Sequence, residues 1–404
     1  MGRFFRYDKG KCLRNREQHE PFPGARAALF WIGGYDEKTL KRTGLVLGIL
    51  LGLAVAALAG YVGYLQLQYY RIEDGTELEI ARPQDALLAV DTPYTAVSCN
   101  MGFGAYGPDY SFFMDTGEML DGTPTQGSSG RALSRESVLE NTQAALDTLQ
   151  QLDADLMLLQ EVDEDAHRSY RVNQREMTVE TFPAYSHVWG ENFHSGFLLY
   201  PFTDPHGDTT AGLQTLSRYR VDKAVRRSYP IDENFFLKFT DLDRCFTVLY
   251  LPVENSDRQL VLVHSHMSAY DEGGTVRARQ LELLCDVIEA EYQAGNYVIV
   301  GGDFNHALYG TAHAFDHQQT FPGWVQTMDN SDLPEHFAFV EADNGFEVPT
   351  CRGADLPYTP GVNYTTVVDG FLVSDNVRAT AQNIDTGFAF SDHNPVELTF
   401  ELAG

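Results

Sequence analysis

Residues 296–306 read Asn-Tyr-Val-Ile-Val-Gly-Gly-Asp-Phe-Asn-His. The apolar run 297–300 predicts a strand that is buried on both faces. We expect it to break at Gly301 and Gly302, where the backbone can turn freely and approach a ligand closely. Asp303 and Asn305 follow, and in extended backbone their side chains would point the same way. A carboxylate and an amide at the end of a buried strand suit a phosphate and its metal ion, although the same residue types also form turns.

Two segments of the chain share one order of elements: a helix, then a buried strand, then an acidic residue. Ser134 is a candidate N-cap for a helix, and apolar residues at helical spacing continue to Leu152. A second buried strand, 155–160, follows this helix, and we expect it to end on Glu161. A later helix begins near Thr275 and ends before Gly295, just ahead of the strand at 297–300. Two such helix–strand units, each ending in an acid, indicate two similar halves that share one cleft.

Further strands are expected through the second part of the chain. They lie at 94–99, 184–189, 196–199, 212–216, 245–251, 260–266, 366–373 and 395–400, with irregular segments at 102–130 and 313–351. Many strands with few, widely separated helices predict a pair of packed sheets with helices on the outside.

The N-terminal part has a different character. Residues 1–42 carry ten Lys or Arg and five Asp or Glu, so the rest of the 404-residue chain, whose total charge is −28, carries −33. No charged residue occurs from 44 to 65, and a membrane-spanning helix needs about 20 such residues. The basic flank predicts a cytoplasmic N-terminus and an extracytoplasmic remainder. A cleaved signal peptide is the alternative, but its basic leader would exceed the usual length.

We therefore divide the chain into four parts: a basic cytoplasmic segment (1–42), a transmembrane helix (43–67), a tether with little secondary structure (68–93) and a domain (94–404). This is the layout of a single-pass protein of the cell membrane. Gly44, Gly48 and Gly52 form overlapping GxxxG units, which permit a weak homodimer through the helix.

The five cysteines show no metal-binding spacing. Cys12 is expected in the cytoplasm, and Cys99 and Cys285 lie in apolar-patterned segments where buried free thiols are the default. One disulfide among Cys99, Cys245, Cys285 and Cys351 stays open as an alternative.

Polar side chains stand at or near the ends of the expected strands, and strand ends of a sandwich gather at one edge. They are Asn100, Glu161, His266, Asp303, Asn305, Asp369, Asp392 and His393. Glu161 is a hard oxygen ligand suited to Mg²⁺, Asp392 is a candidate second carboxylate, and Asn100 is a neutral oxygen ligand or an orienting group.

The histidines need partners that define their protonation. His393 would contact a phosphate or handle a proton, and Asp369 is the candidate partner that fixes its tautomer. His264 and His266 share one face of their strand, and we expect His264 to be a hydrogen-bonded structural residue.

Five short motifs occur in one order. They are Gln-Glu at 160–161, Val-His-Ser-His at 263–266, Gly-Asp-Phe-Asn at 302–305, Val-Asp-Gly-Phe-Leu-Val-Ser at 368–374 and Ser-Asp-His-Asn-Pro at 391–395. In this order they resemble the endonuclease/exonuclease/phosphatase superfamily, which is similar to pancreatic deoxyribonuclease and includes apurinic endonucleases, neutral sphingomyelinases and inositol-polyphosphate phosphatases. The resemblance implies a four-layer α/β/β/α sandwich and a Mg²⁺-dependent phosphoesterase site, with Mn²⁺ as an alternative.

The resemblance also implies roles for the residues. Glu161 would be the main metal ligand, with Asn100 and Asp392 nearby. Asp303 would align or deprotonate the attacking water. Asn305 and His266 would contact the phosphate. The His393–Asp369 pair would stabilise the developing negative charge or relay a proton. Gly102 stands where many relatives place a second polar side chain, so the number of metal ions stays open.

The substrate is less well defined by the sequence. Arg168 and Arg171 follow Glu161 and are candidates for binding a second anionic group, or else part of a solvated loop. The charge of −33 opposes a long polyanion, but bound Mg²⁺ reverses the charge locally. Apolar stretches at 112–114 and 321–324 are candidate lipid contacts. Three functions therefore remain: a membrane-anchored phosphoesterase acting on a lipid headgroup, a small phosphate ester or nucleic acid; an extracellular nuclease; and a non-catalytic binding module.

Overall fold

The computed structural model describes residues 36–231, 235, 237–239, 243–269, 275–323 and 325–404. The chain forms two compact units, 1–63 and 64–404. The basic segment expected at 1–35 and Cys12 lie outside the described residues.

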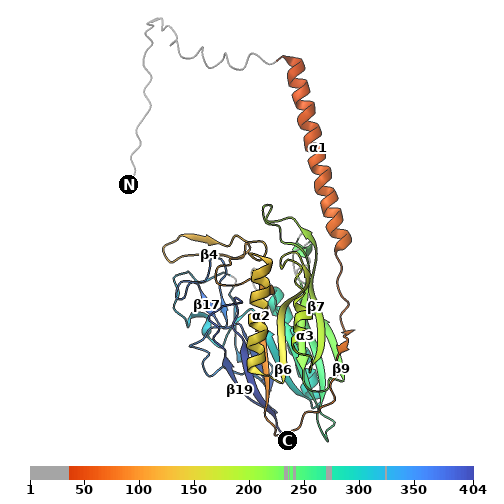
Figure 1. Cartoon of the computed structure of the whole chain (residues 1–404), viewed down its shortest axis with the longest axis vertical. Helices are drawn as coiled ribbons and strands as arrows, with labels where there is room; N and C mark the ends of the chain where they lie inside the picture. The colour runs from red at the N-terminus through yellow and green to blue at the C-terminus, as the bar shows by residue number, and fades with distance from the viewer. Residues whose placement is uncertain (1–35, 232–234, 236, 240–242, 270–274, 324) are drawn as a thin grey trace, which may run out of the picture. The chain divides into compact units, whose positions relative to one another are not determined.

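Helix α1 (Glu37–Gln68) has 32 residues and contains the stretch 43–67 that was expected to span a membrane (Figure 1). At 1.5 Å per residue it is about 48 Å long, which exceeds the apolar thickness of a bilayer. Its apolar window contains at most two charged residues, so by length and composition it can cross a membrane. A Cβ atom added to Gly44, Gly48 or Gly52 would meet no atom within 4 Å.

Two seven-stranded sheets make up the centre of the 64–404 unit. The first has, in spatial order, β1 (Thr76–Glu77), β9 (Lys223–Ser228), β10 (Cys245–Pro252), β11 (Gln259–His266), β12 (Tyr297–Asp303), β18 (Asp369–Ser374) and β15 (Phe337–Phe339). The second has β19 (Val377–Asn383), β20 (Val396–Leu402), β3 (Tyr94–Asn100), β6 (Leu156–Ala166), β8 (Gly207–Ser217), β7 (Ser186–Leu198) and β2 (Ile80–Ala81).

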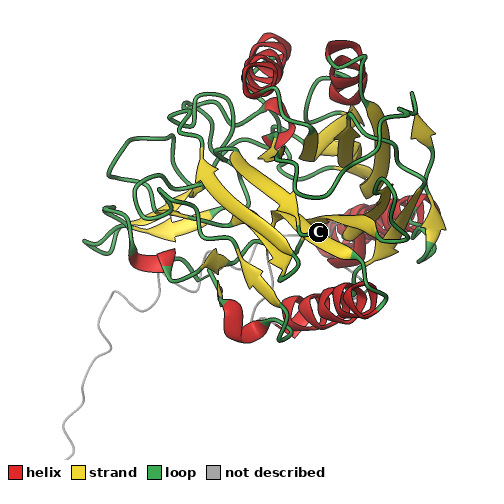
Figure 2. Cartoon of the chain, turned by 90° about the horizontal axis from the view of Figure 1, so that it is seen from below, coloured by secondary structure: helices red, strands yellow, loops and turns green. Residues whose placement is uncertain are grey.

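The sheets pack face to face, and helices cover their outer faces (Figure 2). Leu158 of β6, Leu262 of β11 and Ile299 of β12 meet in the core between the sheets. On the outer face of the first sheet, Val298 and Val300 pack under helix α4 (Thr275–Gln293). The second sheet is covered by α2 (Arg135–Leu152) and α3 (Gln174–Thr181). This arrangement confirms the predicted four-layer α/β/β/α sandwich, and it explains why the run 297–300 is apolar without alternation.

Short elements build the loops at the ends of the sheets. They are β4 (Thr116–Glu118) paired with β5 (Pro124–Gln126), β13 (Ala307–Leu308) with β14 (Thr327–Met328), β16 (Cys351–Arg352) with β17 (Thr365–Thr366), and 3₁₀ turns at Gly102–Gly104, Leu237–Phe239, Thr311–His313 and Asn330–Asp332.

Both predicted helices begin and end where their signals lie. The Ser134 hydroxyl accepts a hydrogen bond from the Ser137 amide, and the Ser137 hydroxyl accepts one from the Ser134 amide, so α2 has a reciprocal cap. Beyond α4, Gly295 has a φ of 92°, a conformation in which glycine carries no steric penalty.

Several strand boundaries differ from expectation. The strands expected at 184–189 and 196–199 are one strand, β7, and the segment 366–373 forms β17 and then β18, which begins at Asp369. The strand expected to end on Glu161 continues to Ala166, because a bulge at Glu161 absorbs the irregularity and the pairing with β8 resumes at Val162.

The strand was expected to break at Gly301 and Gly302, and this prediction was wrong: β12 continues through both glycines to Asp303. Both positions exclude a side chain because the sandwich is tight there. A Cβ on Gly301 would lie 2.4 Å from the Phe371 ring, and one on Gly302 would lie 1.9 Å from the Ser265 carbonyl oxygen.

The segment 68–93 was expected to be a tether and is instead part of the folded unit. Strand β1 pairs with β9, strand β2 pairs with β7, and Leu88 is fully buried between the sheets. The segment therefore completes one edge of each sheet. The four cysteines in the described part of the chain are free thiols, with Cys99 buried and Cys285 only partly buried.

Candidate active site

The side chains predicted to form the site come from both sheets and meet at one end of the sandwich. Asn100 is the last residue of β3, while His266 and Asp303 are the last residues of the parallel neighbours β11 and β12. Antiparallel pairing sets Asp303 opposite Asp369, the first residue of β18. The loop before β20 brings in His393, whose Nδ1 lies 2.7 Å from Asp369 Oδ2.

Asp303 lies at the centre of this group and is almost fully buried. Its Oδ2 accepts a hydrogen bond from Asn100 Nδ2 at 3.0 Å, and its Oδ1 accepts one from the Asn305 amide at 2.8 Å. His266 Nε2 is 3.4 Å from Oδ2. Burial, together with the nearby charge of Asp369, raises the pKa of Asp303 to about 6, although His393 opposes the rise.

His393 and Asp369 form a buried pair. Burial disfavours the charged imidazole, but the Asp369 carboxylate outweighs burial and raises the pKa of His393 well above its ordinary value. The ring is therefore a cation near neutral pH, and its Nε2 faces Asp303 at 3.8 Å. Ligating atoms of Asp303, Asp369 and His393 all lie within 4.8 Å of one another, close enough to hold a metal ion.

Two further carboxylates lie at the same end. Glu161 adopts a φ of 51° in the β6 bulge and is partly buried, and within the described residues its carboxylate accepts no hydrogen bond. Burial raises the pKa of Asp392 to about 7, and the repulsion of Glu161 adds to this shift against the opposing charges of His393 and Arg352. A cation held between these two carboxylates would stabilise the charged form of Asp392.

Asn100 and Asn305 act mainly on the Asp303 carboxylate. Asn100 Oδ1 accepts a hydrogen bond from the Gly102 amide, and its Nδ2 is used on Asp303. Of the two roles expected for Asn100, the contacts favour the orienting one. Asn305 has a φ of 50°, so its backbone is not extended, and its Nδ2 donates to the Met267 carbonyl at 2.9 Å.

Sterics explain why position 102 is a glycine, where many members of the family that the sequence resembles have a polar residue. The φ of Gly102 is 50°, and an added Cβ would lie 2.9 Å from the Tyr106 ring and 3.1 Å from Asp392 Oδ1. A second polar side chain does not fit at this position without moving the wall of the site.

The two histidines of β11 have different surroundings. His264 is fully buried between the sheets, where its ring nitrogens contact Gln160 Nε2 at 2.7 Å and Thr215 Oγ1 at 2.8 Å, as expected of a structural residue. His266 belongs to the site. Burial and the charge of Arg244 lower its pKa well below the ordinary value, so its ring is neutral.

Arg168 and Arg171 were expected to bind a second anionic group, and their surroundings do not fit that role. Arg168 is 6% exposed, pairs with Asp163 through two hydrogen bonds and stacks on the Phe103 ring. Arg171 pairs with Asp165 and Asp208. Both guanidinium groups are neutralised by carboxylates that the continued β6 strand and β8 supply.

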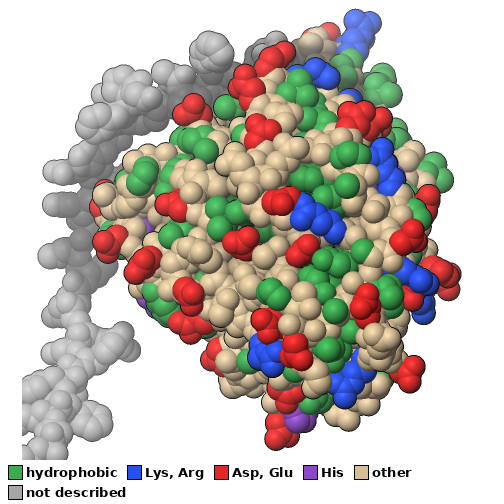
Figure 3. Space-filling model, turned by 60° about the horizontal axis from the view of Figure 1, so that its bottom comes forward, with side chains coloured by type: hydrophobic (Ala, Val, Ile, Leu, Met, Phe, Trp, Pro, Cys, Tyr) green, Lys and Arg blue, Asp and Glu red, His purple; other side chains and the backbone are tan. Residues whose placement is uncertain are grey.

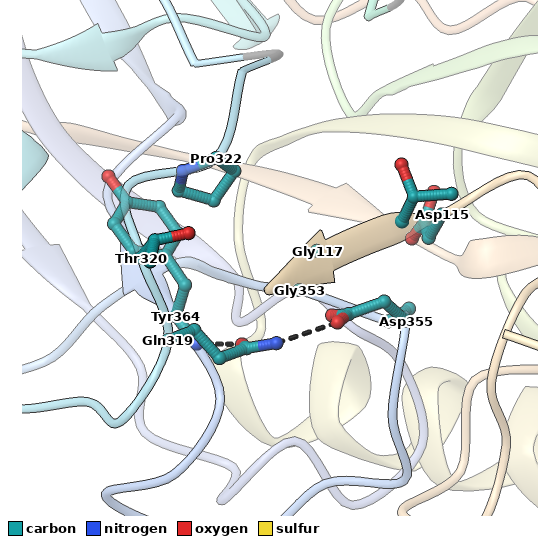
Figure 4. A pocket seen from close by; sticks show the side chains of 10 residues that line it. Asp115, Gly117, Gln319, Thr320, Pro322, Gly353, Asp355 and Tyr364 are labelled. Carbon is teal, nitrogen blue, oxygen red and sulfur yellow. Dashed lines mark hydrogen bonds between the residues drawn. The ribbon is translucent and has the colours of Figure 1, made fainter. Parts of the chain in front are cut away.

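The sequence did not predict the residues that contact the Asp392 backbone and line the neighbouring pocket. Arg352 is 2% exposed, its amide donates to the Asp392 carbonyl, and its guanidinium donates to the Tyr106 and Gly107 carbonyls. A small pocket opens next to it, where Asp355 accepts hydrogen bonds from Gln319 and Thr125 and so holds the β4–β5 hairpin (Figure 4). These residues lie in irregular loops, where no periodic signal marks them.

The fold and this cluster of acids, amides and histidines define a class of α/β/β/α phosphoesterase-like proteins. The model of the Endonuclease/Exonuclease/phosphatase family matches residues 100–393. The chain belongs to this family, whose members are generally phosphoester hydrolases.

Solved structures share the fold at low sequence identity. An endonuclease/exonuclease/phosphatase from Beutenbergia cavernae has 17% identity and a TM-score of 0.51, with 77% of this chain and 72% of that chain covered. A family protein from Leptotrichia buccalis has 14% identity and a TM-score of 0.50, with 76% and 100% covered. Truncated TDP2 of Caenorhabditis elegans has 13% identity and a TM-score of 0.47, with 76% and 98% covered. No curated protein sequence matches the chain.

Proposed function

We propose that this protein is a divalent-metal-dependent hydrolase of phosphodiester or phosphomonoester bonds, anchored by α1 in the cell membrane. The observation that carries the proposal is the junction of the Asp303–Asp369–His393 cluster with the partly buried carboxylates of Glu161 and Asp392. Such a junction combines a proton acceptor, a fixed cation and oxygen ligands for a metal, which are the needs of phosphoryl transfer to water.

The metal proposed is Mg²⁺, with Mn²⁺ as an alternative, and its ligands are Glu161 and Asp392. The donor chemistry fits, because both are hard oxygen ligands, and a bound cation would stabilise the charged form of Asp392, whose pKa burial raises to about 7. The carboxylate of Asp303 fits less well, since both of its oxygens already accept hydrogen bonds, whereas among the described residues Asp369 uses only Oδ2, on His393. When bound, the cation would neutralise charge on a phosphate oxygen.

The remaining residues have roles that follow from their contacts. Asp303, with its pKa raised to about 6, accepts a proton from the attacking water, and Asn100 and Asn305 hold the carboxylate in place. His393, kept cationic and oriented by Asp369, donates to the phosphate as negative charge develops. His266 and Asn305 supply further phosphate contacts.

The location follows from α1. The basic flank before the helix favours a cytoplasmic N-terminus and an extracytoplasmic hydrolase. The homodimer through Gly44, Gly48 and Gly52 remains a prediction that no contact supports.

Nucleic acid is the second candidate substrate. Residues 43–404 carry a net charge of −33, which does not favour a long polyanion. Figure 3 shows the lower end of the 64–404 unit, where acidic side chains with scattered Lys and Arg contribute to this charge. A lipid headgroup or a small phosphate ester is therefore preferred, and nuclease activity is the alternative that a direct assay decides.

The test uses the purified full chain in detergent with Mg²⁺, Mn²⁺ or EDTA. Bis(p-nitrophenyl) phosphate, p-nitrophenyl phosphate, plasmid DNA, RNA, sphingomyelin and phosphoinositides are offered in parallel. Metal-dependent hydrolysis that Asp303→Asn abolishes and the exposed-site control Asp375→Asn retains would support the proposal. Silence of the folded wild-type chain on the whole panel would instead favour the non-catalytic binding module.

A further inference from the structure

The connection between β7 and β8 exposes large apolar side chains to solvent. Leu199 is 41% exposed, Tyr200 is 58% exposed and Phe202 is 81% exposed. Single apolar residues on a surface are ordinary, whereas a contiguous group of them marks an interaction site.

These residues are contiguous with a second loop. The Tyr200 ring lies 5.9 Å from that of Phe202 and 5.5 Å from that of Phe113, and Met114 beside it is 44% exposed. We call Phe113, Met114, Leu199, Tyr200 and Phe202 the apolar tip. The segment before α2 joins the two loops. Asp204 accepts a hydrogen bond from the Gly130 amide and pairs with Arg131, and the Phe113 amide donates to the Ser129 carbonyl.

The apolar tip lies at the end of the sandwich that carries the site. A row of aromatic rings connects the two, from Phe113 to Phe112 at 4.9 Å and from Phe112 to Tyr106 at 6.1 Å. The row reaches the site at Gly102, because a Cβ atom added there would lie 2.9 Å from the Tyr106 ring and 3.1 Å from Asp392 Oδ1. The β4 hairpin, which follows Met114, projects at the upper end of the 64–404 unit in Figure 1.

The start of the 64–404 unit identifies what the tip would contact. Tyr64 and Leu65 are its first residues, and both lie against β7 just before the tip. The Phe197 amide donates to the Tyr64 hydroxyl at 3.1 Å, and a Cβ on Gly196 would lie 3.3 Å from Leu65 Cδ2. Because Tyr64 and Leu65 are the last residues of the uncharged stretch 44–65 of α1, the part of β7 that they contact lies where the chain would leave a bilayer, a few residues before the tip.

The charges around the tip are compatible with a headgroup region. Asp204 is paired with Arg131, and Asp208 is paired with Arg171. These pairs remove the repulsion that isolated carboxylates would experience at an anionic lipid surface. Tyr and Phe are the residues that favour the boundary between water and acyl chains.

We propose that the apolar tip inserts into the outer surface of the bilayer that α1 spans and holds the Asp303 site against that surface. The inference rests on the proposed membrane anchoring and deepens the proposed function. It assigns the substrate to phosphoesters of lipid headgroups in the same membrane, since the site would then face the bilayer.

The experiment places a reporter at the tip of the full chain reconstituted in phosphatidylcholine vesicles. Phe202→Trp is compared with wild type, which contains Trp31, Trp189 and Trp324, and with Phe346→Trp. Phe346 is 50% exposed, and its neighbours Asn344 and Val348 bond to β19 on the opposite edge of the sheet. Brominated phosphatidylcholine is expected to quench the added emission of Phe202→Trp by at least about half and to leave that of Phe346→Trp unchanged.

Equal, weak quenching at both positions would overturn the proposal and would assign the tip to another occupant, such as a second copy of the chain. Extraction of the wild-type chain by alkaline carbonate would overturn the anchoring, and with it the tip contact. Quenching does not depend on hydrolysis, so it can succeed where the proposed catalysis fails, or fail where catalysis succeeds.

A second variant connects the tip to the substrate. Tyr200→Ser/Phe202→Ser is expected to hydrolyse bis(p-nitrophenyl) phosphate within twofold of wild type but to lose at least about tenfold on sphingomyelin or phosphoinositide in vesicles. Unchanged turnover of both vesicle lipids, or equal losses on vesicle and dispersed substrates, would contradict the assignment.

Discussion

Asp303 accepts two hydrogen bonds that keep its carboxylate in place, and the rings of His266 and His393 lie 3.4 and 3.8 Å from its Oδ2. Replacing it by Asn keeps the size of the side chain and removes its basicity. We expect Asp303→Asn to lower kcat by about 10²–10⁴, the usual contribution of a general base, with little change in the metal concentration that gives half-maximal rate. Asp375→Asn, on the exposed surface, is the matched control. A full-activity Asp303→Asn enzyme would exclude this residue as the base.

Glu161 has a different expected effect, because its proposed partner is the metal. Glu161→Gln retains an oxygen but removes a charge, so we expect the Mg²⁺ concentration for half-maximal activity to rise by at least about tenfold, with part of the rate recovered at high Mg²⁺. Glu164→Gln, three residues further along the same strand, is the control. Identical Mg²⁺ dependence in Glu161→Gln and wild type would show that the metal is held elsewhere, with Asp303, Asp369 and His393 as the next candidates.

At this scale the sequence predicted the members of the site better than their partners. The His393–Asp369 contact was predicted from two motifs that each follow or begin a strand. The partner of Arg168, Asp163, was not predicted, because Asp163 faces it only when β6 continues past Glu161. Short-range spacing does not indicate whether a strand ends or bulges, since both place a polar residue after an apolar run.

Among the elements, β12 shows how closely its backbone approaches that of its neighbour β11 at the site. Gly302 has a φ of 142°, and the Ser265 carbonyl oxygen occupies the space of a Cβ atom. We expect Gly302→Ala to lower the free energy of unfolding by at least about 3 kcal/mol in urea titrations, because backbone rather than a flexible side chain must move. Gly107→Ala, whose Cβ would meet its nearest neighbour at 3.4 Å, is expected to change it by less than about 1 kcal/mol. Equal stability of the two variants would contradict this description of β12.

Strand β11 carries a buried histidine that makes stability depend on pH. Burial lowers the pKa of His264 to about 3, whereas in the unfolded chain the ordinary value is 6.5. Below pH 6.5 the unfolded state gains a proton that the folded state refuses, so the stability present above pH 6.5 declines as the pH falls.

Between pH 6.5 and pH 5, the free energy of unfolding should decrease in both proteins. We expect the decrease to be about 2 kcal/mol smaller in His264→Gln than in wild type. Urea titrations at the two pH values measure this difference. His336→Gln, at an exposed histidine, should keep the wild-type decline. If the free energy of unfolding of His264→Gln decreased as much as that of wild type, groups other than His264 would cause the pH dependence.

For the whole molecule, the order of strands and helices along the chain was sufficient to predict the sandwich. Periodicity marked the two helices and most central strands, because each packs one face or both against a core. The segment 68–93 was misjudged because β1 and β2 are two-residue edge strands, too short to show a pattern, and Leu88 is a single buried anchor. The contact between the Phe113 and Tyr200 rings in the apolar tip joins loops distant in sequence, so only the fold brings them together.

The measurement that tests the central claim most directly is the rate of bis(p-nitrophenyl) phosphate hydrolysis by the purified full chain as Mg²⁺ is removed and restored. We predict that EDTA abolishes hydrolysis, that Mg²⁺ or Mn²⁺ restores it, and that Asp303→Asn stays at least about a hundredfold slower with metal present. Hydrolysis that persists in EDTA, or that Asp303→Asn performs as fast as wild type, would contradict a metal-dependent site built around Asp303.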